Sequence, residues 1–165
     1  MFGFYTLASV VAVIAIVGAV MVSHTPETYL PNAVPQSQTV APGLVAFREA
    51  AWQFVRDNPT YTGSLPSSAL LANLRAPIGN VDSYNALVQA NWLYVWAGTT
   101  SPAIGSSVQS GRIIAEEAAK LSDGSRLVGY NVGGFLVSPA YGTSTIALPT
   151  SIPQGAPVVV RPLIP

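Results

Sequence analysis

The 165-residue sequence contains no cysteine, one histidine and few charged residues, and each shortage narrows what the chain can do. Without cysteine there are no disulfides, thiolate zinc sites or thiol nucleophiles, although the redox compartment stays undetermined. The single histidine, His24, lies a residue or two beyond the N-terminal apolar run, so no Ser-His-Asp, Cys-His or histidine-metal set is expected in the domain. We therefore expect no enzymatic activity and no catalytic, cofactor-binding or metal-binding residues.

Charge is scarce as well, since 8% of the residues are charged against 50% that are apolar. Seven acidic and seven basic residues balance and are scattered singly or in pairs, so no basic stripe is present to bind nucleic acid. Freely soluble domains usually carry more charge than this. We expect partner proteins or a membrane to cover part of the surface, and we expect no nucleic-acid partner.

One long apolar run stands at the N-terminus. From Phe2 to Ser23 no residue is charged, and the run is long enough to cross about 30 Å of hydrocarbon as a helix. No Lys or Arg precedes the run, and it is longer than the core of a cleaved signal peptide. Residues 1–23 are therefore predicted to form a transmembrane helix that is retained. We expect the N-terminus inside, although no Lys or Arg occurs before Arg48 to fix the orientation.

The next segment, residues 24–42, is rich in proline and polar residues, which predicts an extended tether. Apolar residues then recur at spacings of three and four over residues 43–58, which predicts an amphipathic helix that ends before Pro59. The same spacing predicts a second helix over residues 107–121. These helices are expected to bury four side chains, Phe47, Phe54, Ile114 and Leu121.

Strands are predicted between and after the helices. Residues 92–97 form an aromatic and β-branched run typical of a buried, central strand. Four more runs follow: residues 126–130 and 135–138 as a hairpin around two glycines, residues 143–148, and residues 158–161 as an edge strand between prolines. Residues 60–91 are predicted to be irregular, with one helical turn near Ser67. The fold class is α+β: residues 43–165 form a small domain with two helices packed on a mainly antiparallel sheet.

Three features invite a chemical interpretation, and each has a simpler structural one. Glu116 and Glu117 are neighbours on the second helix and point about 100° apart, which favours a solvated face over acid-base catalysis. The glycines near Gly129 do not spell a phosphate-binding motif and fit a hairpin. Trp92, Tyr94 and Trp96 alternate onto one strand face, where core packing is favoured over a stacking platform for ligands.

Several short sequences resemble one known family. They are Phe47-Arg48-Glu49-Ala50-Ala51, Asn58-Pro59, Tyr61-Thr62-Gly63, Trp92-Leu93-Tyr94-Val95-Trp96, Leu127-Val128-Gly129, Gly134-Phe135-Leu136-Val137-Ser138-Pro139, Tyr141-Gly142-Thr143, Leu148-Pro149 and Ile152-Pro153. Together the sequences resemble the PilM family encoded with the thin, type IVB pili of conjugative plasmids, which is distinct from the actin-like protein of the same name. The resemblance implies an inner-membrane component of pilus assembly or of the pilus base, and it assigns no functional residues.

The expected function is thus a non-enzymatic structural component of a pilus assembly machine, anchored once in the bacterial inner membrane with its domain in the periplasm. Its expected partners are other pilus assembly proteins and pilin, with self-association left open. The alternative is a pilin or minor pilin, because Gly3-Phe4-Tyr5-Thr6-Leu7 resembles a prepilin peptidase site. Against it, a basic leader is missing and Ala8 stands where pilins usually carry glutamate.

Overall fold

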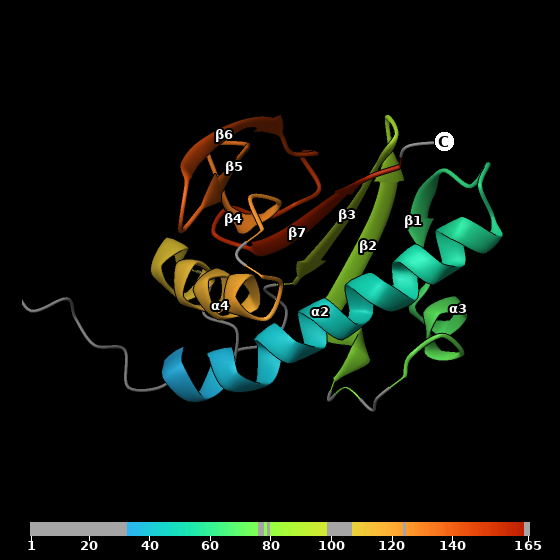
Figure 1. Cartoon of the computed structure of the whole chain (residues 1–165), viewed down its shortest axis with the longest axis horizontal. Helices are drawn as coiled ribbons and strands as arrows, with labels where there is room; N and C mark the ends of the chain where they lie inside the picture. Colours follow the sequence, from blue (N-terminus) through green and yellow to red (C-terminus); the bar gives the residue numbers. More distant parts are fainter. Residues whose placement is uncertain (1–32, 76–77, 79, 99–106, 124, 164–165) are drawn as a thin grey trace, which may run out of the picture. The chain divides into compact units, whose positions relative to one another are not determined.

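The folded part of the chain is one antiparallel sheet with helices on one face (Figure 1). The computed structural model describes residues 33–75, 78, 80–98, 107–123 and 125–163. The elements in chain order are α2 (Ala33–Asp57), β1 (Gly63–Leu65), α3 (Ser67–Leu71), η1 (Val81–Ser83), β2 (Tyr84–Gln89), β3 (Trp92–Ala97), α4 (Val108–Lys120), β4 (Val128–Val132), β5 (Phe135–Ser138), β6 (Gly142–Ala147) and β7 (Pro157–Pro162). The predicted α+β class with a mainly antiparallel sheet is confirmed.

The sheet is ordered β1-β2-β3-β7-β4-β5-β6, and every neighbouring pair is antiparallel. Strand β3 is an interior strand, as predicted. The prediction that residues 158–161 form an edge strand is wrong, because β7 occupies the middle of the sheet between β3 and β4. The two prolines stand at the first and last positions of β7, where a missing N–H interrupts the ladder least. Between them, Val158, Val159 and Val160 are almost fully buried.

Helix α2 begins ten residues earlier than predicted. The sequence predicted an extended tether up to Pro42, but the structure is helical from Ala33 onward, which corrects that prediction for residues 33–42. Pro35 falls in the first turn, where the backbone N–H has no intrahelical acceptor. Pro42 lies inside the helix and costs one hydrogen bond. Burial of Val40, Ala41 and Leu44 against the sheet offsets that cost.

Helix α4 matches its prediction closely, with Ser107 as N-cap: its Oγ accepts a hydrogen bond from the backbone N–H of Ser110 at 3.1 Å. The expected burial is confirmed for Phe47 and Ile114, while Phe54 is only partly buried against the core. The prediction that Leu121 is buried is wrong, since it is 50% exposed. Leu121 is the C-cap residue, so it lies beyond the last helical turn that packs on the sheet.

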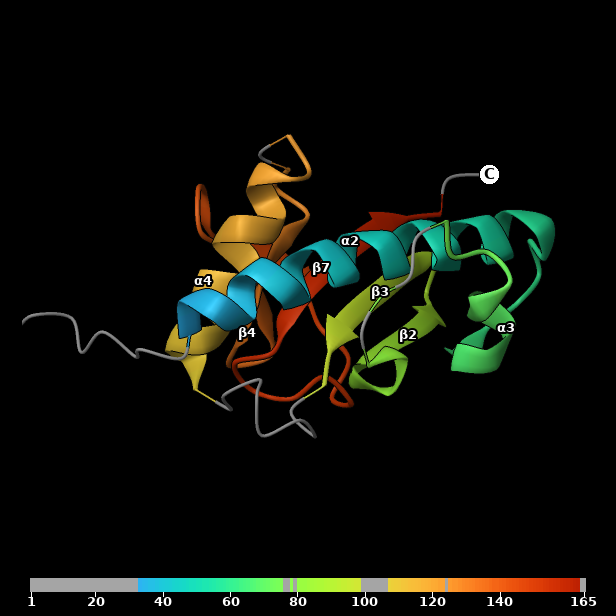
Figure 2. The same ribbon diagram turned by 90° about the horizontal axis from the view of Figure 1, so that it is seen from below.

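Both faces of the sheet are covered. Helices α2 and α4 pack on one face of the sheet, as Figure 2 shows from below. Leu93, Val95 and Val159 point to this face, since they belong to the same core cluster as Phe47 of α2 and Ile114 of α4. The opposite face carries Tyr94 and Trp96, together with Leu136, Leu148, Ile152, Ala156, Val158 and Val160. Residues 148–156 therefore form an irregular segment that covers the face of the sheet opposite helices α2 and α4. The prediction that both faces of β3 are occupied is confirmed.

Asn131 fastens this irregular segment to the sheet. Its side chain is 4% exposed, and its Nδ2 donates to the carbonyl oxygens of Ile152 at 2.7 Å and Pro153 at 3.1 Å. Its Oδ1 accepts a hydrogen bond from the Gly134 N–H at 3.0 Å. One buried amide thus joins β4, the following turn and the segment that covers the second core cluster.

Two hairpin turns use left-handed backbone. The predicted β4–β5 hairpin is confirmed, and Gly133 and Gly134 have φ of 60° and 84°. The β2–β3 turn was missed: Ala90 and Asn91 adopt φ of 50° and 62° without glycine. The prediction that residues 60–91 are irregular is accordingly wrong for β1 and β2, whereas the helical turn near Ser67 is confirmed as α3.

None of the described helices combines the length and the apolarity that a membrane crossing requires. The predicted transmembrane helix at residues 1–23 and the first part of the predicted tether lie outside the described residues. By its internal contacts the chain divides between Pro31 and Asn32, so the compact domain starts about ten residues before the predicted boundary at residue 43.

Candidate interaction surfaces

The features singled out in the sequence for chemistry all have structural roles in the described part of the chain. Tyr94 and Trp96 are 6% and 7% exposed and belong to the second core cluster, so core packing is the correct interpretation for them. Trp92, nearer the strand end, is half-buried and packs against the same cluster. The glycines form the β4–β5 hairpin, with Gly129 packed against the backbone of Val137.

The two glutamates of α4 form surface ion pairs. Arg112 Nε lies 3.0 Å from Glu116 Oε1 one turn away, and Lys120 Nζ lies 3.0 Å from Glu117 Oε2. All four side chains are well exposed, so each pair contributes at most about 0.5 kcal/mol to helix stability. Within the described ranges, no three His, Cys, Asp or Glu side chains cluster as metal ligands would.

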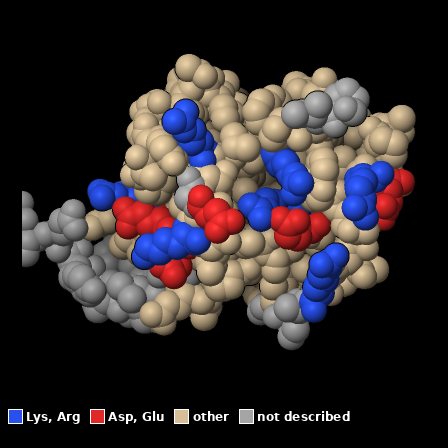
Figure 3. Space-filling view, viewed as in Figure 1, with Lys and Arg blue, Asp and Glu red and all other residues tan. Residues whose placement is uncertain are grey.

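Charged side chains concentrate along the two long helices. In Figure 3 they form a band over α2 and α4, while most of the remaining surface on this view carries no charge. The residues from Leu127 to Val160, which include β4, β5 and β6, contain no charged residue at all. Three exposed large apolar side chains lie in this uncharged part: Val132 at 36%, Phe135 at 46% and Tyr141 at 55%.

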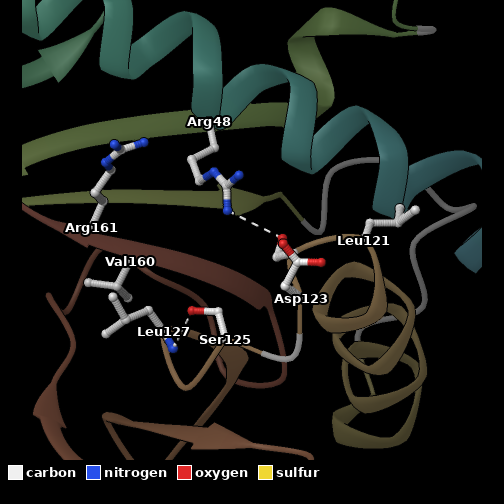
Figure 4. Close-up of a pocket in the computed structure, with 8 residues that line it drawn as sticks. Arg48, Leu121, Asp123, Ser125, Leu127, Val160 and Arg161 are labelled. Atoms are coloured by element: carbon white, nitrogen blue, oxygen red, sulfur yellow. Dashed lines mark hydrogen bonds between the residues drawn. The ribbon is translucent and has the colours of Figure 1, made fainter.

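One polar pocket of about 300 Å³ lies within the charged band, between α2, the end of α4 and β7 (Figure 4). Arg48 extends from α2 and donates to Ser122 Oγ at 3.3 Å. Arg161 and Val160 extend from β7 with Leu127 beside them, and Leu121 and Asp123 lie across the pocket from these residues. Glu49 connects the two guanidinium groups, since its carboxylate oxygens lie 2.6 Å from Arg48 and 3.7 Å from Arg161. Glu49 therefore offsets part of the positive charge of the two arginines, with one negative charge against two positive charges.

A larger groove of about 690 Å³ lies at the other end of α2, and we call it the α2-end groove. Its lining is mainly apolar and comes from α2, the segment before β1, the β2–β3 hairpin and the residue after β7. The residues that matter most are Trp52, Val55, Arg56, Tyr61, Val88 and Leu163. A volume of this size falls in the range of about 300–1,000 Å³ that is typical of binding pockets.

Trp52 and Arg161 link the pocket and the groove. The Arg161 guanidinium carbon lies 3.9 Å above the centre of the Trp52 ring, within cation–π range. Arg161 lines the pocket, whereas Trp52 lines the groove. Arg48, Trp52 and Arg56 follow one another at intervals of four residues and so lie along one side of α2.

The sequence interpretation missed both depressions. The four-residue spacing of Arg48, Trp52 and Arg56 was a usable signal of a binding surface. A helix face that only contacts water is polar throughout, whereas this face carries a tryptophan between two arginines. The other walls come from elements that are distant in sequence, notably β7 and the β2–β3 hairpin. Their positions depend on the strand order, which no local pattern revealed.

These features define the class of the molecule: a small α+β domain whose open depressions lie beside one long helix. The chain belongs to the PilM family, whose model, described only as PilM, matches residues 11–160.

A solved structure agrees with this assignment. The crystal structure of a protein described as PilM from Escherichia coli B7A aligns with a TM-score of 0.52 and 17% identity, covering 83% of this chain and 99% of that one. At this identity the likeness shows a shared fold. A comparison with curated protein sequences finds no significant match.

Proposed function

We propose that the chain is a non-enzymatic structural component of a type IVB pilus assembly machine or pilus base. In this proposal one N-terminal helix anchors it in the bacterial inner membrane, and the α+β domain lies in the periplasm. It acts there by binding other assembly proteins or pilin, and no cofactor takes part. Membership of the PilM family is the main support.

The extent of the family match carries the proposal. The match begins at residue 11, inside the apolar run, and continues through the whole domain to Val160. The second half of the apolar run therefore belongs to the pattern that defines the family, together with the folded domain. This supports a retained membrane anchor over a signal peptide that is removed. The depressions beside α2 support a role in protein contacts.

Fractionation of cells that make the tagged chain tests this proposal. We expect the intact protein, with residues 1–23 attached, in the inner membrane, and we expect protease added to spheroplasts to digest the domain. Deleting the gene should abolish pili, and the full chain should restore them.

The pilin alternative gives a different result in the same experiment. A mature protein that begins near Phe4 and is recovered in sheared filaments would replace our proposal with a pilin subunit. A mature protein that begins after Ser23 would show a cleaved signal and contradict the anchor.

A further inference from the structure

We propose that the α2-end groove binds an extended segment of a partner protein that places an apolar side chain in the groove and a carboxylate against Arg56. The choice of a protein segment over a small molecule rests on the proposed function. The groove, its charge and its rigidity come from the described residues and stand independently of the pilus role.

The floor and walls suit an apolar side chain. Val55 and Val88, at 4% and 3% exposure, close the bottom, where the groove meets the main core cluster. Trp52, Tyr61 and Leu163 are partly buried residues that line the groove above them. An apolar side chain that binds here covers several apolar surfaces at once. It therefore removes more apolar area from water than it would by contacting one isolated apolar residue on the surface.

The aromatic walls are already fixed in position. The Arg161 guanidinium lies 3.9 Å above the Trp52 ring, and the Tyr61 hydroxyl donates to the Ser64 carbonyl oxygen at 2.6 Å. The Tyr61 ring also contacts Phe54 edge-on, with centroids 5.3 Å apart. Because these rings lose little further freedom when a ligand binds, the groove is preorganised.

Charge complementarity selects an acidic segment. Among the described residues that line the groove, Arg56 is the one that carries a charge. Its side chain is 61% exposed, and its ion-pair partner Asp57 is 3.9 Å away and 56% exposed, which is a loose contact. A guanidinium group has five N–H donors in a planar fork, so Arg56 retains donors for a second carboxylate. The groove therefore favours an apolar residue next to Asp, Glu or a terminal carboxylate.

Fluorine NMR of the full chain tests this directly. The chain has three tryptophans, so labelling with 5-fluorotryptophan in detergent micelles gives three signals, and Trp52→Phe assigns one of them. The probes are acetyl-Gly-Leu-Leu-Glu-Gly-amide and the matched peptide with Gln in place of Glu. We expect the Glu peptide to shift the Trp52 signal and to bind about two- to fivefold more tightly than the Gln peptide.

Two variants complete the experiment. Arg56→Gln should remove the preference for the Glu peptide, whereas Arg75→Gln, an exposed arginine outside the groove, should leave it unchanged. The proposal is overturned if neither peptide shifts the Trp52 signal, if both bind equally to the unaltered chain, or if the shift falls on Trp92 and Trp96 instead. A concentration-dependent Trp52 shift without peptide would also overturn it, because a second copy would then occupy the groove. Pili are not needed for this measurement, so its failure leaves the proposed function standing.

Discussion

Asn131 satisfies three backbone groups at once, and its replacement should be costly. Asn131→Ala leaves the carbonyl of Ile152 and the N–H of Gly134 without this partner, whereas the carbonyl of Pro153 still accepts from the Ala156 N–H at 3.1 Å. Unpaired buried polar groups cost roughly 1–3 kcal/mol each, partly offset where water enters. We expect a loss of about 2–4 kcal/mol in the free energy of unfolding, measured by urea denaturation. Asn85→Ala, an exposed position on β2, is the control and should change it by less than about 0.5 kcal/mol.

The two β3 tryptophans should differ in their contribution to stability. Trp96 is 7% exposed in the second core cluster, so Trp96→Ala removes a buried ring and leaves a cavity, at a cost of about 3–5 kcal/mol. Trp92 is half-buried at the strand end, and its replacement by Ala should cost less than half as much. Thermal unfolding of both variants checks this. Equal melting of Trp96→Ala and the unaltered protein would contradict the core role of Trp96, and loss of a ligand or partner in the same variant would show that Trp92, Tyr94 and Trp96 form a binding surface.

At the scale of elements, Tyr84 joins α2 to the sheet. Its ring stacks on Phe47 with centroids 5.6 Å apart, and its hydroxyl donates to the carbonyl oxygen of Val40 at 3.3 Å. A methyl group on Gly43 would clash with this ring, so glycine in α2 permits the close approach. The first buried turns of α2 therefore pack against the residue that begins β2.

Stability should fall at high pH because of this tyrosine. Burial raises the pKa of Tyr84 above its ordinary value near 10, so the unfolded chain releases the proton at lower pH than the folded chain. The stabilisation is complete below about pH 10 and decreases as pH rises toward the folded pKa. Urea unfolding between pH 8 and 11 measures the decline.

A tyrosine-to-phenylalanine variant is the control. Tyr84→Phe should reduce the slope without abolishing it, since burial raises the pKa of Tyr94 as well. An unchanged slope in Tyr84→Phe would exclude Tyr84 as a source of the pH dependence.

The spacing of apolar residues was sufficient to predict the elements whose boundaries depend on their own local sequence. Helix α4, β3 and the β4–β5 hairpin were all predicted close to their observed positions. Local sequence gave the wrong prediction where contacts with residues distant in sequence determine the conformation or the position in the sheet. Prolines predicted an extended chain at residues 33–42, but burial of Val40 and Ala41 makes it helical. Prolines also predicted an edge for β7, but pairing with both β3 and β4 makes it central.

At the scale of the whole molecule, the start of α2 shortens the proposed tether. Residues 24–32 span at most about 30 Å when fully extended, about half the reach of a tether that continued to Pro42. We expect replacement of residues 24–32 by a Gly/Ser sequence of equal length to leave pili intact, because only reach matters there. The same replacement over residues 33–42 should destabilise the domain, since it removes buried Val40 and Ala41.

Pilus counts and domain melting temperatures separate these outcomes. Loss of pili after the change at residues 24–32, with an unchanged melting temperature, would mean that this segment makes contacts of its own. An unchanged melting temperature after the change at residues 33–42 would contradict the role of this part of α2 in the fold.

The central position of β7 has a consequence for biosynthesis. The half-sheets β1-β2-β3 and β4-β5-β6 are each built from strands that follow one another in the chain, but they are joined through β7, the last described strand to leave the ribosome. A nascent chain can therefore form both hairpin assemblies while the sheet between them is still open. If the domain crosses the membrane during synthesis, as its proposed place in the periplasm allows, the translocation machinery receives a polypeptide whose two half-sheets are not yet joined by β7. The final strand pairing would then take place on the far side of the membrane, where we propose that the domain binds its partners.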